Sequence, residues 1–262
     1  MPIIDSPPAI EITYIGGPTA IIEIAGLRFL TDPTFDAPGD YAVGAVVLRK
    51  TEAPAIQVSD IGRIDAVLLS HDQHADNLDR AGRVLAEQLP TLTTRAGAVR
   101  IGHQAIGLEP WETREFEGPT GVRLRVTATP ARHGPAGIEK LVGDVVGFVI
   151  SSVEPDADLV YVTGDTVWYE GTAEVARRFA PAAVILFGGA ARTRGPFHLT
   201  MDTNDAVEAA IAFPHAVIVP VHHSGWAHFS QSQSDLVKTF ATLGLQDRLR
   251  PVAPAARTTV AF

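Results

Sequence analysis

Short apolar or alternating runs, separated by glycine, proline and aspartate, occupy the first forty residues of the chain. Such runs are typical of strands joined by tight turns, and they predict strands at residues 11–17, 19–26 and 27–33. Residues 38–61 show no clear period and are predicted to form a surface loop around a short strand at 45–50. The chain is therefore expected to begin with a β-rich part.

Strands and helices alternate in the rest of the chain. The unbroken apolar run at 65–70 predicts a buried strand, and residues 77–89 carry apolar side chains at helical spacing. Further strands are predicted at 91–94, 97–102, 122–131, 144–151, 158–165, 182–189 and 215–223, and further helices at 171–180, 203–213 and 234–244. This order favours an α/β fold in which helices flank two packed sheets. A length of 262 residues suits one domain spanning residues 1–262.

Composition limits the partners and the metal ligands that the chain can have. The formal charge of -9 opposes binding to nucleic acid. The absence of cysteine excludes thiolate ligands and a cysteine nucleophile, so any metal must be held by nitrogen and oxygen donors. No run approaches eighteen apolar residues, and no secretory leader is recognisable. We therefore expect a cytoplasmic protein without a transmembrane segment; the sequence leaves a homo-oligomer open.

Four of the predicted strands end in a side chain that can coordinate a metal. These side chains are His71, His133, Asp165 and His222. Strand ends on one edge of a sheet lie close together, and ligand sites of layered α/β folds usually lie at that edge. His223 follows His222, and since adjacent strand residues point to opposite sides, at most one of the pair should face such a site. The sequence thus predicts a metal site of histidine and aspartate.

Five blocks of the chain, in order and spacing, resemble the metallo-β-lactamase-fold hydrolases: YIGGPTAIIEIAGLRFLTDPTFD, LLSHDQHADNLD, ATPARHG, YVTGDT and VPVHHSGWAHF. Within that family the chain looks most like the branch of ascorbate phosphate lactonase-like and N-acyl-phosphatidylethanolamine phospholipase D-like proteins. The resemblance implies a four-layer αββα sandwich. It also implies that His71 is the first metal ligand, His133 the lone histidine ligand, Asp165 the bridging carboxylate and His222 the last ligand.

The block after the first ligand departs from the family signature H-x-H-x-D-H. Gln73 stands at the second histidine position, His74 follows, the aspartate is displaced to Asp76, and Asn77 replaces the final histidine. A neutral amide is a weak ligand for zinc. Three interpretations remain open: an extra loop residue lets His74 replace the missing imidazole, only one ion binds, or the chain is metal-poor with altered activity.

The resemblance implies a hydrolase that uses a divalent metal, most readily zinc with manganese or iron as alternatives, in one or two ions. A metal-activated water would attack an ester, lactone, amide or phosphodiester of a small or medium-sized substrate. Asp76 would ligate a second ion or accept the proton of the attacking water. The alternatives are a phospholipase D-like phosphodiesterase, with residues 37–47 as an apolar entry rim, and a metal-depleted, non-hydrolytic descendant that binds a ligand.

Three further side chains are candidate substrate contacts: His198, Trp226 and His228. His198 lies near a predicted helix start, where a structural role also explains it. An aromatic side chain such as Trp226 is also explained by ordinary packing. Asp32, in the sequence TDP, is a candidate to orient a ligating histidine, although aspartate before proline is also common in turns.

Overall fold

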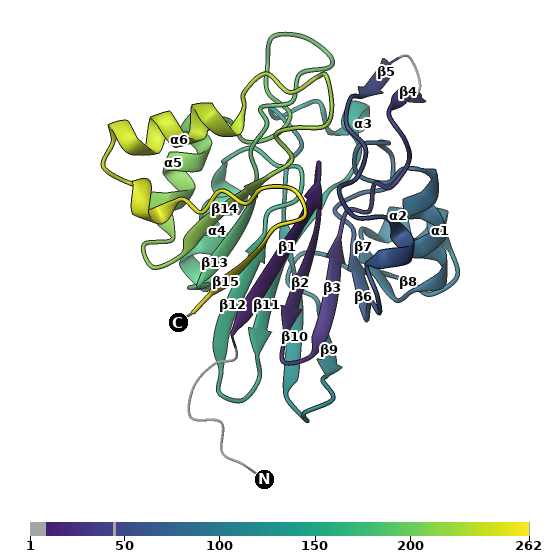
Figure 1. Cartoon of the computed structure of the whole chain (residues 1–262), viewed down its shortest axis with the longest axis vertical. Helices are drawn as coiled ribbons and strands as arrows, with labels where there is room; N and C mark the ends of the chain where they lie inside the picture. The colour runs from purple at the N-terminus through teal and green to yellow at the C-terminus, as the bar shows by residue number, and fades with distance from the viewer. Residues whose placement is uncertain (1–8, 44–45, 262) are drawn as a thin grey trace.

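The computed structural model describes residues 9–43 and 46–261. Ala45, where the strand predicted at 45–50 begins, lies outside the described residues. Two large β-sheets and a separate hairpin make up the strands (Figure 1). The first sheet has the strand order β15-β1-β2-β3-β6-β7-β8. Its strands are β1 (Ile10–Gly16), β2 (Thr19–Ile24), β3 (Leu27–Thr31), β6 (Ala66–Leu68), β7 (Thr91–Thr93), β8 (Ala105–Gly107) and β15 (Arg257–Val260).

The second sheet has the strand order β14-β13-β12-β11-β10-β9. Its strands are β9 (Thr113–Glu117), β10 (Arg123–Pro130), β11 (Val146–Ser152), β12 (Ala157–Val162), β13 (Ala183–Phe187) and β14 (Val217–Val221). Strands β12, β13 and β14 run parallel to one another, and β9 to β12 pair antiparallel. The parallel strands therefore point their carboxyl ends to the same edge of the sheet.

Helices cover the outer faces of both sheets (Figure 1). A shared core lies between the sheets and includes Ile12, Phe29, Phe148 and Ile185. The helices are α1 (Arg80–Gln88), α2 (Arg95–Ile101), α3 (Glu139–Val142), α4 (Glu170–Arg178), α5 (Thr203–Ala212) and α6 (Gln233–Thr242), with short 3-10 turns at Val58–Asp60 and Gln246–Arg248. On the outer face of the second sheet, side chains of α4, α5 and α6 pack against β12 and β13, and on the first sheet α1 and α2 pack against β3 and β6. The predicted four-layer αββα sandwich is confirmed.

The strand predicted at residues 97–102 is wrong, because this segment belongs to helix α2. The side chain of Thr94 accepts a hydrogen bond from the backbone N–H of Gly97 at 3.0 Å and so caps the helix. Gly97 and Ile101, four residues apart, share its buried face. The cap residue and the helical spacing outweigh the β propensity of Val99 and Ile101.

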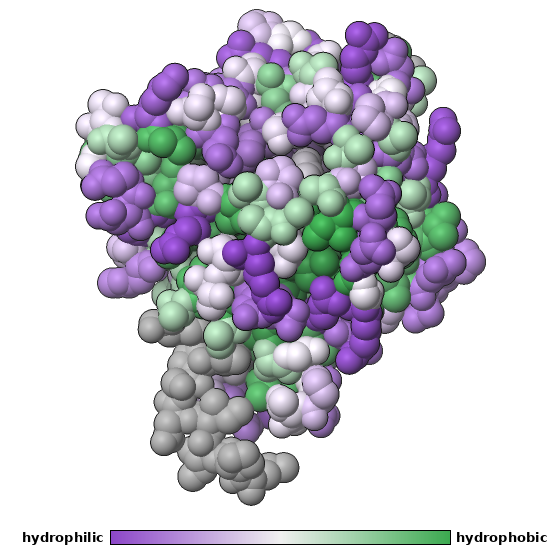
Figure 2. Space-filling model, viewed as in Figure 1, coloured by the Kyte–Doolittle hydropathy of each residue, from purple (hydrophilic) through white to green (hydrophobic). Residues whose placement is uncertain are grey.

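A two-stranded hairpin of β4 (Gly39–Val43) and β5 (Val46–Lys50) extends from the upper end of the sandwich in Figure 1. The loop predicted there therefore contains an extra strand. Figure 2 shows a predominantly polar face with apolar residues in smaller areas, and the large exposed apolar side chains, among them Val47, Val99 and Ile211, are spread over separate elements. Within the described part of the chain, every helix is too short or too polar to cross a membrane.

Candidate metal centre

The four side chains singled out at strand ends meet at one end of the sandwich. His71 follows β6 of the first sheet, while His133, Asp165 and His222 follow β10, β12 and β14 of the second sheet. All four side chains are buried. His222 adopts a left-handed backbone conformation with φ of 55°, and its N–H donates to the carbonyl of Gly17 at 2.7 Å.

The first group of donor atoms consists of three imidazoles and one carboxylate: His71, His74, His133 and Asp165. One ligand atom from each lies within 4.8 Å of all the others. Nδ1 of His74 lies 2.8 Å from Nε2 of His71 and 3.2 Å from Nε2 of His133. Oδ2 of Asp165 lies 3.7 Å from Nε2 of His133. The group offers the nitrogen and oxygen donors that zinc accepts.

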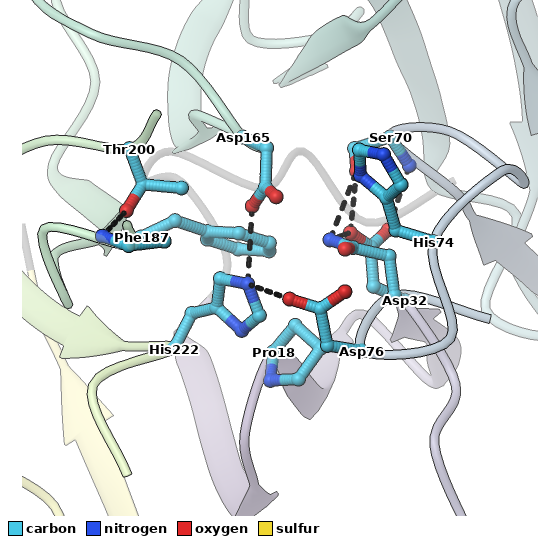
Figure 3. A network of polar contacts seen from close by, with 12 residues as sticks. Pro18, Asp32, Ser70, His74, Asp76, Asp165, Phe187, Thr200 and His222 are labelled. Atoms are coloured by element: carbon cyan, nitrogen blue, oxygen red, sulfur yellow. Dashed lines mark hydrogen bonds and ion pairs between the residues drawn. The ribbon is translucent and has the colours of Figure 1, made fainter. Parts of the chain in front are cut away.

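The second group consists of Asp76, Asp165 and His222, whose ligand atoms also lie within 4.8 Å of one another. Figure 3 shows both carboxylates pointing toward the ring of His222. Nε2 of His222 lies 3.3 Å from Oδ1 of Asp165 and 3.5 Å from Oδ2 of Asp76. Asp165 thus presents one oxygen to each group, as a carboxylate that bridges two ions must.

Several buried polar atoms of these groups have no hydrogen-bond partner among the described residues. They include Oδ1 of Asp76 and Nδ1 of His222. Buried polar atoms are almost always paired, so unpaired ones at one place need an explanation such as an ion. The donor atoms and the unpaired atoms together fit divalent metal at both positions.

The charges at the centre also suit a cation. Burial lowers the pKa of His74 to about 4, helped by repulsion from His133, so this imidazole is neutral and free to coordinate. Burial opposes a proton on His222 as well, but Asp165 and Asp76 outweigh it and raise the pKa of His222 to about 10. The two carboxylates therefore favour positive charge at the second position.

Polar partners orient the histidines of the first group. Nδ1 of His133 donates to the carbonyl of Leu199 at 2.8 Å, which leaves Nε2 for a metal. Nδ1 of His71 lies 3.0 Å from Oγ of Ser70, which donates to Oδ2 of Asp32 at 2.5 Å (Figure 3). Burial raises the pKa of Asp32 to about 7, although three donated hydrogen bonds oppose the rise. Asp32 thus reaches a ligating histidine through Ser70, in line with its predicted orienting role.

Gln73 and Asn77, the two residues that depart from the family signature, make contacts other than those of a metal ligand. The side-chain amide of Gln73 packs against Gly143, where an added Cβ would come within 2.3 Å of Nε2. Asn77 is fully buried, and its Nδ2 donates to Oδ2 of Asp32 at 2.9 Å. His74 stands in the first group instead, an arrangement that matches the interpretation in which the loop contains one extra residue.

A small, partly open cavity lies beside both groups. It is lined by Val46, Leu48, His74, Asp76, His133, Ala191, Thr193, Arg194, Leu199 and His228. Of the three predicted substrate contacts, His228 lines this cavity. His198 is instead held by Asp202, whose Oδ2 lies 2.9 Å from Nδ1, and Trp226 is buried over Lys50, with Nζ 5.6 Å from the ring centre. Both roles stay predictions.

Sequence reasoning missed Arg194 and Leu48, whereas Val46 belongs to the apolar entry rim named at residues 37–47. Arg194 lies in a loop without a periodic pattern, and its charge near the centre contributes to the lowered pKa of His74, after burial and His133. The signal available in the sequence was the alternation of Val46 and Leu48 along one strand, which places both on one face.

Comparison with known proteins supports this description. A profile for the family described as the beta-lactamase superfamily domain matches residues 27–223. UPF0173 protein YddR of Bacillus subtilis is 28% identical over 86% of this chain and 90% of its own length. A UPF0173 metal-dependent hydrolase of Thermoplasma acidophilum is 27% identical over 61% of this chain and 66% of its own length. The crystal structure of isothiocyanate hydrolase from gut bacteria of Delia radicum superimposes with a TM-score of 0.80 and 25% identity, covering 96% of this chain and 98% of the other.

Proposed function

Because this chain belongs to the beta-lactamase superfamily and is a metal-dependent hydrolase, we propose that it hydrolyses a small substrate at an ester, lactone or amide carbon. The observation that carries the proposal is the cavity, in which apolar side chains face the two donor groups. Four of its lining residues are apolar: Val46, Leu48, Ala191 and Leu199. Such a lining binds the body of a small molecule, while few polar groups orient the bond to be broken.

The metal is proposed to be zinc, with manganese or iron as alternatives, at one or both positions. A bound divalent ion lowers the pKa of water from about 15.7 to about 7 and so makes a nucleophile available at neutral pH. The residues that would hold ions are His71, His74, His133, Asp165, Asp76 and His222. Asp76 also lines the cavity, and its Oδ1 has no partner among the described residues, so we assign it the proton of the attacking water as well.

The side chain of Arg194 gives the cavity a positive charge beside the donor groups. A guanidinium stabilises negative charge that develops on a substrate oxygen or sulfur during attack. The similarity to isothiocyanate hydrolase makes small isothiocyanates a specific group of substrates to test, since they also present an electrophilic carbon. The partner of the site is accordingly a small molecule.

The test is a screen of zinc-loaded protein against small esters, lactones, amides and isothiocyanates, with Asp76→Ala beside the parent. We expect turnover of at least one class, lost on chelation and restored by zinc. If Asp76 only ligates, Asp76→Ala loses metal; if it only accepts the proton, the variant keeps its metal content without turnover. Full activity in Asp76→Ala would refute both roles, and no turnover by the metal-loaded parent would refute the proposal.

A second candidate is a phospholipase D-like phosphodiesterase. The β4–β5 hairpin favours it, because Val46 and Leu48 line the cavity while the side chain of Val47 between them is 62% exposed. Phosphodiesters added to the same screen distinguish the two activities. A ligand-binding descendant without hydrolysis is the remaining alternative; the cytoplasmic location and the single domain stay predictions.

A further inference from the structure

The backbone of His222 is held by the sheet opposite its own. His222 follows β14 of the second sheet, and its N–H donates at 2.7 Å to the carbonyl of Gly17, in the turn between β1 and β2 of the first sheet. The φ of His222 is 55°, a left-handed conformation that a non-glycine residue keeps only where its surroundings hold it. The contact with Gly17 therefore helps to place the imidazole of His222 in the second donor group.

The carbonyl of Gly17 accepts a second hydrogen bond, which comes from a side chain of the core. The hydroxyl of Tyr14 donates to it at 3.2 Å. Tyr14 lies in β1 and is fully buried among the core residues between the two sheets. A carbonyl oxygen has two lone pairs and can accept both bonds. Because the hydroxyl and the N–H of His222 share one acceptor, Tyr14 helps to set the direction in which this carbonyl points.

The end of β1 is irregular at the place where these groups meet. The register of β1 against β2 shifts between Tyr14 and Gly16, as it does at a β-bulge. A bulge bends its strand and redirects neighbouring side chains. Gly17 has a φ of 56°, and a Cβ added there would lie 3.3 Å from Nε1 of Trp226. The irregular backbone thus brings the hydroxyl of Tyr14 to the carbonyl of a residue three positions along the chain.

Tyr14 also lies beside the residue that follows His222. The ring centres of Tyr14 and His223 are 6.0 Å apart, and their planes are tilted by 43°. Tyr14 is itself fixed in the first sheet, where its N–H donates to the carbonyl of Ala256 at 3.1 Å. It therefore meets the segment that carries the ligand at two points: through the shared carbonyl at the N–H of His222, and directly at the ring of His223.

We infer that Tyr14 is a positioning residue of the metal centre, which fixes the backbone of His222 through the carbonyl of Gly17 and so places that imidazole at the second position. The inference rests on the proposed metal-dependent hydrolysis. A site works only when its groups are held within about 0.5 Å of their places. A shift of His222 should therefore weaken the second position and spare the first, whose imidazoles come from other segments. The rival account is that the hydroxyl only stabilises the β1–β2 turn.

The test compares the parent with Tyr14→Phe and, as a matched control, with Tyr161→Phe. Both variants remove a phenolic hydroxyl from a fully buried ring. Tyr161 belongs to the cluster on the outer face of the second sheet, where its ring centre lies 5.5 Å from that of Phe213. Elemental mass spectrometry and chelator competition give the number of ions and the affinity for each, and His71→Ala and His222→Ala serve as references that assign the ions to the two positions.

We expect Tyr14→Phe to lose affinity about 10-fold at the second position, the lower end of the loss seen when a partner that orients a ligand is removed. Its affinity at the first position should stay that of the parent, and Tyr161→Phe should keep both affinities. A hydroxyl that only stabilises the turn would not distinguish the two positions.

A second readout is made on the metal-free protein. Hydrogen exchange of the His222 amide reports how firmly its bond to the carbonyl of Gly17 is held. We expect faster exchange in Tyr14→Phe and the parent's rate in Tyr161→Phe. Unchanged affinity at the second position, equal losses at both positions, or the parent's exchange rate in Tyr14→Phe would overturn the inference. A parent that binds no metal would overturn the proposed function itself.

Discussion

Ser70 connects Asp32 to His71 at the candidate metal centre. Replacing it should lower both the stability of the fold and the affinity for metal. Its backbone N–H donates to Oδ1 of Asp32 at 2.6 Å, its hydroxyl donates to Oδ2 at 2.5 Å, and the same hydroxyl lies 3.0 Å from Nδ1 of His71. Because the hydroxyl proton points to Asp32, the oxygen accepts from His71. This fixes the tautomer of His71 and leaves its Nε2 lone pair for an ion.

The variant Ser70→Ala removes the hydroxyl and keeps the backbone bond to Asp32. A buried N–H of His71 then lacks an acceptor, which costs about 1–3 kcal/mol, and Asp32 loses a hydrogen bond of about 0.5–1.5 kcal/mol. Since both losses concern one hydroxyl, we expect an overall decrease of about 3 kcal/mol in the free energy of unfolding. We also expect a 10–100-fold loss of affinity for the ion at the first position.

Urea unfolding of the metal-free protein measures the first effect, and chelator competition measures the second. Ser151→Ala is the matched control: Ser151 is equally buried, and its hydroxyl donates to Oδ1 of Asp158 at 2.7 Å, at the end of β11 remote from the centre. The control should lose about 1 kcal/mol of stability and no metal affinity. Parent-like metal affinity in Ser70→Ala would refute the assignment of Ser70 as the partner that orients His71.

Two stability predictions concern buried charge. Lys50→Met removes the buried ion pair between Nζ of Lys50 and Oδ2 of Asp79 at 3.2 Å, which should lower the free energy of unfolding by about 3 kcal/mol in urea titrations. The control Arg49→Met breaks an exposed ion pair and should lower it by less than about 1 kcal/mol. Equal losses in the two variants would refute the reasoning. Burial raises the pKa of Asp205 from 3.8 to about 6, so between these values the unfolded chain releases a proton that the folded chain keeps, and stability falls as pH rises. Asp205→Asn should therefore gain stability relative to the parent between pH 4 and pH 6, and a difference independent of pH across that range would contradict the shift.

The sequence predicts the central strands well because their burial leaves an unambiguous apolar run. The run at 65–70 became β6, and the run at 182–189 became β13, whose five side chains are all buried. Strand β9 was missed because its side chains are mostly exposed, so nothing but pairing with β10 defines it. Pairing is a tertiary property that no local pattern carries.

The candidate site was predictable where a residue follows a buried strand, because the strands of one sheet end at a common edge. His133, Asp165 and His222 follow β10, β12 and β14 of the second sheet and meet at that edge. Arg194 and His228 lie in irregular segments, where spacing along the chain says nothing about direction, and their places are set by contacts with distant elements.

The loop from His71 to Asp79 brings His74, and not Gln73, to the first group of donor atoms. At one end of the loop Ser70 is held by Asp32, and at the other end Asp79 caps α1 and pairs with Lys50. Between these fixed ends the carbonyl of His74 accepts a hydrogen bond from the N–H of Leu78 at 2.9 Å, and the side chain of Gln73 lies against Gly143. Counting from His71 assigns the ligand position to Gln73, whereas the anchored turn brings His74 to the first group of donors, so the number of ions bound should depend on His74 and not on Gln73.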